Sequence, residues 1–189
     1  MEIKMRWKVL EEKEVFKVKN RLSITVQKIK LPNGKIVDDY YQIHFPESVV
    51  IVARTQEKKI ILLKHYLHGF RRESIVLVGG QVEGKETALE TAKRELLEET
   101  GYTSHDWLPL GSIVPHVNQI CGKVHFFFAD KARKTAKPTS NDLEDMKVIF
   151  KNKKEIVDCI RSKKIISMGT IVALSLAKIY LQRGSYFAK

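Results

Sequence analysis

The chain has 189 residues, of which 43% are hydrophobic, and this is enough for one compact domain with a buried core. Its first sixteen residues alternate charged residues with single hydrophobic ones, which argues against a secretory signal or a membrane segment and predicts a soluble, cytoplasmic protein. The two cysteines, Cys121 and Cys159, lack the paired spacing of a disulfide framework or a thiolate metal site.

Basic residues are in excess. Lysine and arginine outnumber aspartate and glutamate by 34 to 22, which gives a net charge of +12. Such an excess favours polyanionic partners, including nucleotides, RNA and other phosphates. It also occurs on lysine-rich surfaces that serve only solubility, and no basic run here carries interleaved aromatic residues. Charge alone therefore does not decide between an RNA partner and a small nucleotide.

The first third of the chain predicts antiparallel strands. Residues 21–30 and 35–45 are extended stretches on either side of a Leu-Pro-Asn-Gly turn at 31–34. Asn-Gly between two such stretches favours a hairpin. Residues 48–54 and 59–66 form a second pair, rich in Val and Ile, which suits strands that are covered on both faces.

The middle of the chain predicts a helix over residues 87–100. Thr87 and the glutamate three residues later have the spacing of a capping box, and Gly101 is a natural stop. An apolar run at 75–78 precedes it and ends at a break, Gly79-Gly80. Beyond the helix we expect a strand over 124–129, a polar basic loop over 130–142, and helices over 153–162 and 168–182. This order predicts a mixed α/β or α+β fold with helices packed on a sheet.

Three acids on the predicted helix share one side. Each helical residue turns about 100°, so Glu95, Glu98 and Glu99 fall within roughly 100° of arc, beside the apolar stripe that contains Ala92. Clustered anions next to the interior repel one another unless a cation compensates them. Mg²⁺ is the natural choice, because it bridges carboxylates to substrate phosphates. Arg94 can pair with Glu98, or with the glutamate one turn earlier, and hold a carboxylate in place.

If the three acids are considered alone, the alternative to a metal site is a glutamate-rich helix whose acids are simply solvated. A longer pattern decides against it, because it resembles the Nudix box at nine positions of fixed spacing. The last position, Tyr102, usually holds an aliphatic residue in that box. The full pattern is Gly80, Glu86, Arg94-Glu95-Leu96, Glu98-Glu99, Gly101 and Tyr102.

Resemblance to the Nudix superfamily implies an α/β/α sandwich with a mixed sheet and hydrolysis of a nucleoside diphosphate linked to another group. More weakly, and over most of the chain, it resembles the ADP-ribose or nucleotide-sugar pyrophosphatase branch. This resemblance rests on the N-terminal strand region and on residues 77–80, 125–129 and 142–148. That branch implies an N-terminal antiparallel β region, residues 1–46, which contributes to a homodimer, followed by a Nudix domain at 47–189. It also implies Mg²⁺, with Mn²⁺ as a substitute, and cleavage of ADP-ribose to AMP and ribose 5-phosphate.

The resemblance further assigns roles to individual residues. Asp142 takes the position of a catalytic carboxylate in an acidic loop, where the family has a glutamate, so that Asp142 or Glu98 removes the proton of the attacking water. Arg94 orients the acids. The implied metal ligands are the carbonyl group of Gly79 and the carboxylates of Glu95, Glu98, Glu99 and Glu144.

Two departures from the branch concern the substrate. Leu67 stands where the branch has a phosphate-contacting arginine, and Val76 replaces an acid. Arg71 or Arg72 could supply the missing cation, although paired loop arginines are more often solvated. Two other functions stay open: a Nudix hydrolase of RNA 5′ ends or nucleoside triphosphates, and a noncatalytic nucleotide sensor on the same fold.

Overall fold

The computed structural model describes residues 6–139 and 146–181. The chain divides into two compact units. Unit 1 comprises Met1–Glu47 and Ile113–Lys123, and unit 2 comprises Ser48–Ser112 and Val124–Lys189. The sequence-based division at residues 46 and 47 stays a prediction.

Unit 1 is a four-stranded sheet in the order β1-β2-β3-β10. The first three strands are antiparallel, whereas β10 runs parallel to β3. The predicted turn between β2 and β3 is confirmed, since the N–H of Gly34 donates to the carbonyl oxygen of Leu31 at 2.9 Å. The strands are β1 (Lys8–Val18), β2 (Leu22–Lys30), β3 (Ile36–His44) and β10 (Ile120–Cys121).

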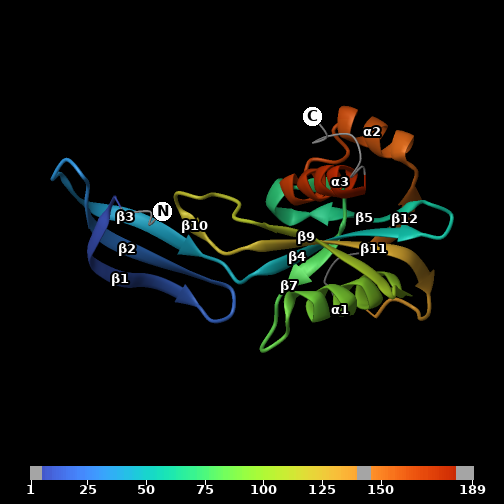
Figure 1. The fold of residues 1–189 in the computed structure, drawn as a ribbon, viewed down its shortest axis with the longest axis horizontal. Coiled ribbons are helices and arrows are strands. Elements are labelled where there is room, and N and C mark those ends of the chain that lie inside the picture. Colours follow the sequence, from blue (N-terminus) through green and yellow to red (C-terminus); the bar gives the residue numbers. More distant parts are fainter. Residues whose placement is uncertain (1–5, 140–145, 182–189) are drawn as a thin grey trace. The chain divides into compact units, whose positions relative to one another are not determined.

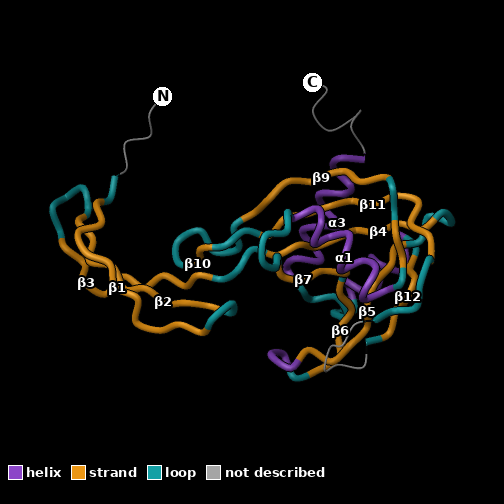
Figure 2. Tube along the Cα trace, turned by 90° about the horizontal axis from the view of Figure 1, so that it is seen from below, coloured by secondary structure: helices purple, strands orange, loops and turns teal. Residues whose placement is uncertain are grey.

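Unit 2 is an eight-stranded mixed sheet between helices. The main path is β12-β5-β4-β11-β8, with β6 beside β5, β7 beside β4 and β9 beside β11. Helix α1 (Ala88–Thr100) covers one face, and α2 (Lys153–Arg161) and α3 (Met168–Leu181) cover the other (Figure 1). Figure 2 shows the same strands and helices from below, coloured by secondary structure. The predicted α/β/α sandwich is therefore confirmed. The strands are β4 (Ser48–Thr55), β5 (Ile60–Leu67), β6 (Arg72–Val76), β7 (Val78–Gln81), β8 (Tyr102–Thr103), β9 (Asp106–Ile113), β11 (Val124–Lys134) and β12 (Lys147–Lys151).

The helices follow the sequence-based ranges to within one residue at each end. They are α1 (Ala88–Thr100), α2 (Lys153–Arg161) and α3 (Met168–Leu181), with a short 3₁₀ turn, η1, at His68–Phe70. Within residues 6–139 and 146–181, no helix is long and apolar enough to cross a membrane. The cytoplasmic location stays a prediction.

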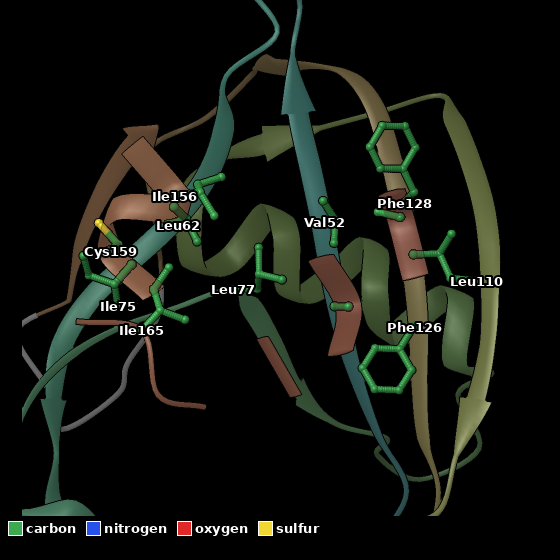
Figure 3. Close-up of a cluster of buried hydrophobic side chains, with 12 residues drawn as sticks. Val52, Leu62, Ile75, Leu77, Leu110, Phe126, Phe128, Ile156, Cys159 and Ile165 are labelled. Atoms are coloured by element: carbon green, nitrogen blue, oxygen red, sulfur yellow. The ribbon is translucent and has the colours of Figure 1, made fainter. Parts of the chain in front are cut away.

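Two hydrophobic cores form because side chains alternate across the sheet. Ile51 of β4 packs in the core that contains Leu96 of α1. Its neighbour Val52 faces the opposite way, into the core that contains Ile156 of α2 (Figure 3). The central strands are thus covered on both faces, which explains their nearly continuous Val and Ile content.

The predicted break at Gly79-Gly80 is wrong. Strand β7 runs through both glycines and pairs with Val49 and Val50 of β4. The interruption lies instead at Leu77, whose N–H donates to the side-chain oxygen of a threonine on α3 at 3.1 Å. A Cβ atom on Gly79 would lie 2.3 Å from the carbonyl oxygen of Val49. The glycine therefore permits a close approach of two strands rather than ending one.

Strand β11 continues beyond the predicted end at residue 129. The register shifts between Ala129 and Ala132, and Lys131 has a φ of 51°, so a bulge interrupts the ladder and pairing then resumes. The predicted loop over 130–142 is therefore wrong for residues 130–134. Strand β1 lies within the predicted N-terminal antiparallel β region, although its own range was not predicted. The short strands β8 and β10, and the strands β9 and β12, were not assigned ranges from the sequence.

A bidentate ion pair joins β4 to β11. Nε and Nη2 of Arg54 donate to Oδ1 and Oδ2 of Asp130 at 2.8 and 2.7 Å. The guanidinium also lies 5.0 Å from the ring centre of Phe128. The Arg54 hydrogen bond holds the pKa of Asp130 below its ordinary value of 3.8. Both side chains are less than a third exposed, so solvent screens the pair only partly.

We predict that Asp130→Asn lowers the free energy of unfolding at pH 7 by about 1 kcal/mol. The lowered pKa means that Asp130 stabilises the fold above the ordinary carboxyl pKa, and this stabilisation is lost as the pH falls towards the folded-state pKa. The difference between wild type and variant should therefore shrink below about pH 4. Urea unfolding at a series of pH values measures this; a difference that grows with acidity would contradict it.

Candidate active site

Both ends of α1 are fixed by local hydrogen bonds. The N–H of Glu90 donates to Oγ1 of Thr87 at 3.3 Å, and the N–H of Thr87 donates to Oε2 of Glu90 at 2.8 Å. This confirms the predicted capping box. Gly101 ends the helix with a φ of 74°, and its N–H donates to the carbonyl oxygen of Leu97 at 2.7 Å. Fixed ends set the direction in which the acids of α1 point.

The guanidinium of Arg94 joins three carboxylates. Its Nε donates to Oε1 of Glu86 at 2.9 Å. Its Nη1 donates both to Oε1 of Glu95 at 2.9 Å and to Oε2 of Glu98 at 3.0 Å. These hydrogen bonds raise the pKa of Arg94, and the bonds to Glu86 contribute most. The hydrogen bonds from Arg94 are also the largest cause of the lowered pKa of Glu86. Arg94 therefore holds acids from the loop and from the helix in one cluster.

One predicted partner of Arg94 is corrected. Helical spacing allows a pair with Glu90, one turn earlier, but that carboxylate caps the helix through Thr87. Glu86, in the loop before the helix, takes the place beside Arg94. Helical spacing cannot reveal this partner, because eight residues and a change of secondary structure separate the two.

The two glycines of β7 lie against the other acids. A Cβ atom on Gly80 would lie 2.0 Å from Oε1 of Glu95, so a larger residue there would displace that carboxylate from its present position. The N–H of Gly79 donates to Oε2 of Glu99 at 3.2 Å. Glu99 is 9% exposed and the side chain of Glu95 is 13% exposed, whereas that of Glu98 is 42% exposed. Two acids are thus sheltered beside the backbone, and one faces solvent.

The donor set suits a hard divalent cation. Carboxylate oxygens are the ligands that Mg²⁺ prefers, and the space kept open by Gly80 gives Glu95 a fixed place beside the backbone. In the described ranges, however, no three His, Cys, Asp or Glu side chains lie close enough to one another to bind a metal ion in this structure. The predicted residues Asp142 and Glu144 lie outside those ranges.

The predicted substrate arginines make other contacts. Arg71 ends the short 3₁₀ turn with a φ of 55°. Arg72 lies 4.6 Å from the ring centre of Phe70 and donates to the carbonyl oxygen of Lys163 at 2.8 Å. These contacts do not include the acids of α1, and the roles assigned to Arg71 and Arg72 stay predictions.

Comparison with protein families gives a direct match. Residues 44–158 match the NUDIX domain, which is more than half of the chain. A crystal structure titled as an ADP compounds hydrolase superposes with a TM-score of 0.83 at 18% identity, covering 95% of this chain and 96% of that one. At this identity the superposition shows a shared fold. The resemblance that the box predicted is confirmed.

Three curated relatives extend the comparison. The chain is 32% identical over 128 residues to an ADP-ribose pyrophosphatase of Bacillus subtilis (strain 168), which covers 66% of this chain and 69% of the relative. It is 27% identical over 155 residues to a CMP-5'-(N-acetyl-N-hydroxy-3-aminopropyl)phosphonate hydrolase of Streptomyces rubellomurinus (strain ATCC 31215). This match covers 81% of this chain and 73% of the relative. It is also 27% identical over 165 residues to a methanol dehydrogenase activator of Bacillus methanolicus, covering 85% of each. The chain therefore belongs to the Nudix superfamily, in the branch that includes the ADP-ribose pyrophosphatases, and is a Nudix pyrophosphohydrolase.

Proposed function

We propose that the chain is a Mg²⁺-dependent hydrolase of a nucleoside diphosphate sugar, and that ADP-ribose, cleaved to AMP and ribose 5-phosphate, is its substrate. The observation that carries this is the set of three α1 carboxylates. Arg94 holds Glu95 and Glu98, and the backbone of Gly79 donates to Glu99. The relative from Bacillus subtilis named as an ADP-ribose pyrophosphatase supports the choice of substrate.

Each residue of the cluster has a distinct part in the proposed reaction. Glu95, Glu98 and Glu99 would hold Mg²⁺ together with the carbonyl oxygen of Gly79. The bound cation would neutralise charge on the diphosphate and lower the pKa of water. Arg94 orients the acids by holding two of them through one nitrogen atom. These residues place the reacting groups, and no side chain needs to form a bond to phosphorus.

The attacking water loses its proton to a carboxylate. Its oxygen bonds to one phosphorus, and the bond from that phosphorus to the bridging oxygen breaks, which leaves two monophosphates. Glu98 is suited to accept the proton on Oε1, because it is the most exposed of the three acids and its Oε2 already accepts from Arg94. Asp142 is the alternative base that the family resemblance assigns.

The net charge of +12 favours a second candidate, hydrolysis at RNA 5′ ends. An RNA substrate would engage several phosphates, so its KM should rise steeply with salt, whereas that of a small nucleotide sugar should change little. A screen of ADP-ribose, ADP-glucose, nucleoside triphosphates and capped RNA, each at low and high salt, separates the two. Faster turnover of capped RNA than of ADP-ribose would replace the proposal.

We predict that Glu99→Gln lowers kcat for ADP-ribose by about a thousandfold or more, because a sheltered anionic ligand is lost while the shape is kept. The amide oxygen can still accept from the N–H of Gly79, so the melting temperature should stay close to that of wild type. Glu83→Gln is the matched control, since Glu83 is an exposed acid of the same segment. Substantial Mg²⁺-dependent turnover by a folded Glu99→Gln variant would refute the assigned cation site.

Arg94→Lys tests the orienting role. A lysine keeps the charge but cannot bridge Glu86, Glu95 and Glu98 at once. We expect kcat to fall about 10- to 100-fold, with a smaller change in KM, because the acids are displaced rather than removed. Steady-state kinetics and Mn²⁺ affinity by electron paramagnetic resonance should both report the change. Equal Mn²⁺ affinity in wild type and variant would contradict an orienting role.

Strand β1 supports the proposal of a homodimer. It lies at the edge of the unit 1 sheet and is exposed along its whole length. Phe16 and Val18 are 51% and 43% exposed, and Val15 is 47% exposed. Exposed apolar side chains on an edge strand are an aggregation hazard unless another surface covers them. We propose that a second copy of the chain covers β1.

In light scattering the wild-type chain should have twice its 21.8 kDa mass. The double variant Phe16→Glu and Val18→Glu should be monomeric, because it places two charges in the apolar contact. The double variant Lys13→Gln and Lys17→Gln alters exposed positions of the same strand and should stay dimeric. A monomeric wild type, or equal behaviour of the two double variants, would contradict the proposed interface.

A further inference from the structure

A basic pocket lies in unit 2, away from the acids of α1. Its volume is about 580 Å³, and residues of β5, β6, β12 and the end of α2 line it. Its lining includes five cationic side chains and a single acid, Glu73. The five are Lys64, Arg72, Lys151, Lys163 and Lys164. This excess of positive charge in one concave site attracts anions.

The pocket belongs to the face of the sheet that carries α2 and α3. Its lining residues Ile75 and Cys159 are part of the core that contains Ile156 of α2 (Figure 3). The acids of α1 border the other core, which contains Ala92 and Leu96. The basic pocket and the proposed active site therefore lie on opposite faces of one sheet.

The loop after α2 is held in place at the pocket. Arg72 donates from Nη2 to the carbonyl oxygen of Lys163 at 2.8 Å. The carbonyl oxygen of Lys164 accepts from Oγ of Ser74 at 3.0 Å and from the N–H of Ile75 at 2.9 Å. Three hydrogen bonds thus fix this loop to β6. The backbone that carries two of the cations is ordered before any ligand binds, which lowers the entropic cost of binding.

Most of the positive charge in the pocket is left for a ligand. Glu73 pairs with Lys64 at 2.8 Å, and this pair lowers the pKa of Glu73. Lys151 lies 3.8 Å from Glu155 of α2, at the limit of an ion pair. Once Glu73 is matched by Lys64, the lining acids offset none of the charge on Arg72, Lys163 and Lys164. A ligand with several negative charges is needed to match them.

We propose that this pocket binds the phosphate groups of a small multivalent anion of the diphosphate or triphosphate class, at a site separate from the active site. The volume is that of a small-molecule site. The lining within the described ranges lacks aromatic side chains on which the bases of RNA would stack, so a compact phosphate group is favoured over a nucleic acid strand.

Calorimetric titration of the full chain with inorganic tripolyphosphate, in EDTA, tests this site without turnover and without a metal in the active site. We expect one binding event. The double variant Lys151→Gln and Lys164→Gln should weaken it about tenfold or more, because two cations are lost from one pocket. The matched control, Lys153→Gln and Lys178→Gln, removes the same charge elsewhere in unit 2 and should change the affinity less than threefold.

Amide NMR locates the bound anion. Resonances of Ser162 and Lys163 should shift on titration, whereas those of Gly79 and Gly80 should not. Glu99→Gln should bind tripolyphosphate as wild type does, so that this inference and the proposed function can fail separately. Equal weakening in the two double variants, shifts confined to Gly79 and Gly80, or tighter binding of an RNA lacking a 5′ phosphate would each overturn the proposal.

Discussion

The hydrogen bonds from the guanidinium of Arg94 to three carboxylates hold the proposed active site together. Arg94 bonds to Glu86, Glu95 and Glu98 within 3.1 Å, so acids from a loop and from a helix are held in one cluster despite their mutual repulsion. Without a cation at this point the repulsion between these carboxylates would be uncompensated. The protein itself therefore offsets the repulsion between these acids through one arginine.

Two glycines make this cluster compatible with the fold. Gly79 lets β7 approach β4 closely, and Gly80 leaves room for the carboxylate of Glu95. The same β7 backbone donates a hydrogen bond to Glu99. Packing of the sheet and placement of the acids are thus set by one short strand. The alternation of side chains across the sheet leaves the opposite face free to build a basic pocket with different chemistry.

Much of this arrangement could be predicted from sequence, because its signals are local. The capping residues gave the bounds of α1, and the spacing of Glu95 and Glu98 along one helical side gave the cluster. The role of the glycines was missed, since a Gly-Gly pair in isolation indicates a turn and only the neighbouring strand shows why it is extended. Glu86 as the partner of Arg94, and the short strands β8 and β12, depend on tertiary contacts that no local pattern reveals.

The central claim is that the α1 carboxylates bind a divalent cation against a diphosphate. Electron paramagnetic resonance of Mn²⁺ bound to the full chain, with a non-hydrolysable ADP-ribose analogue labelled with ¹⁷O on its phosphates, tests it directly. We expect the Mn²⁺ signal to broaden with the labelled analogue, and to be lost when Glu95 and Glu99 are both replaced by glutamine. An unbroadened signal, or undiminished Mn²⁺ binding by the folded double variant, would contradict the claim.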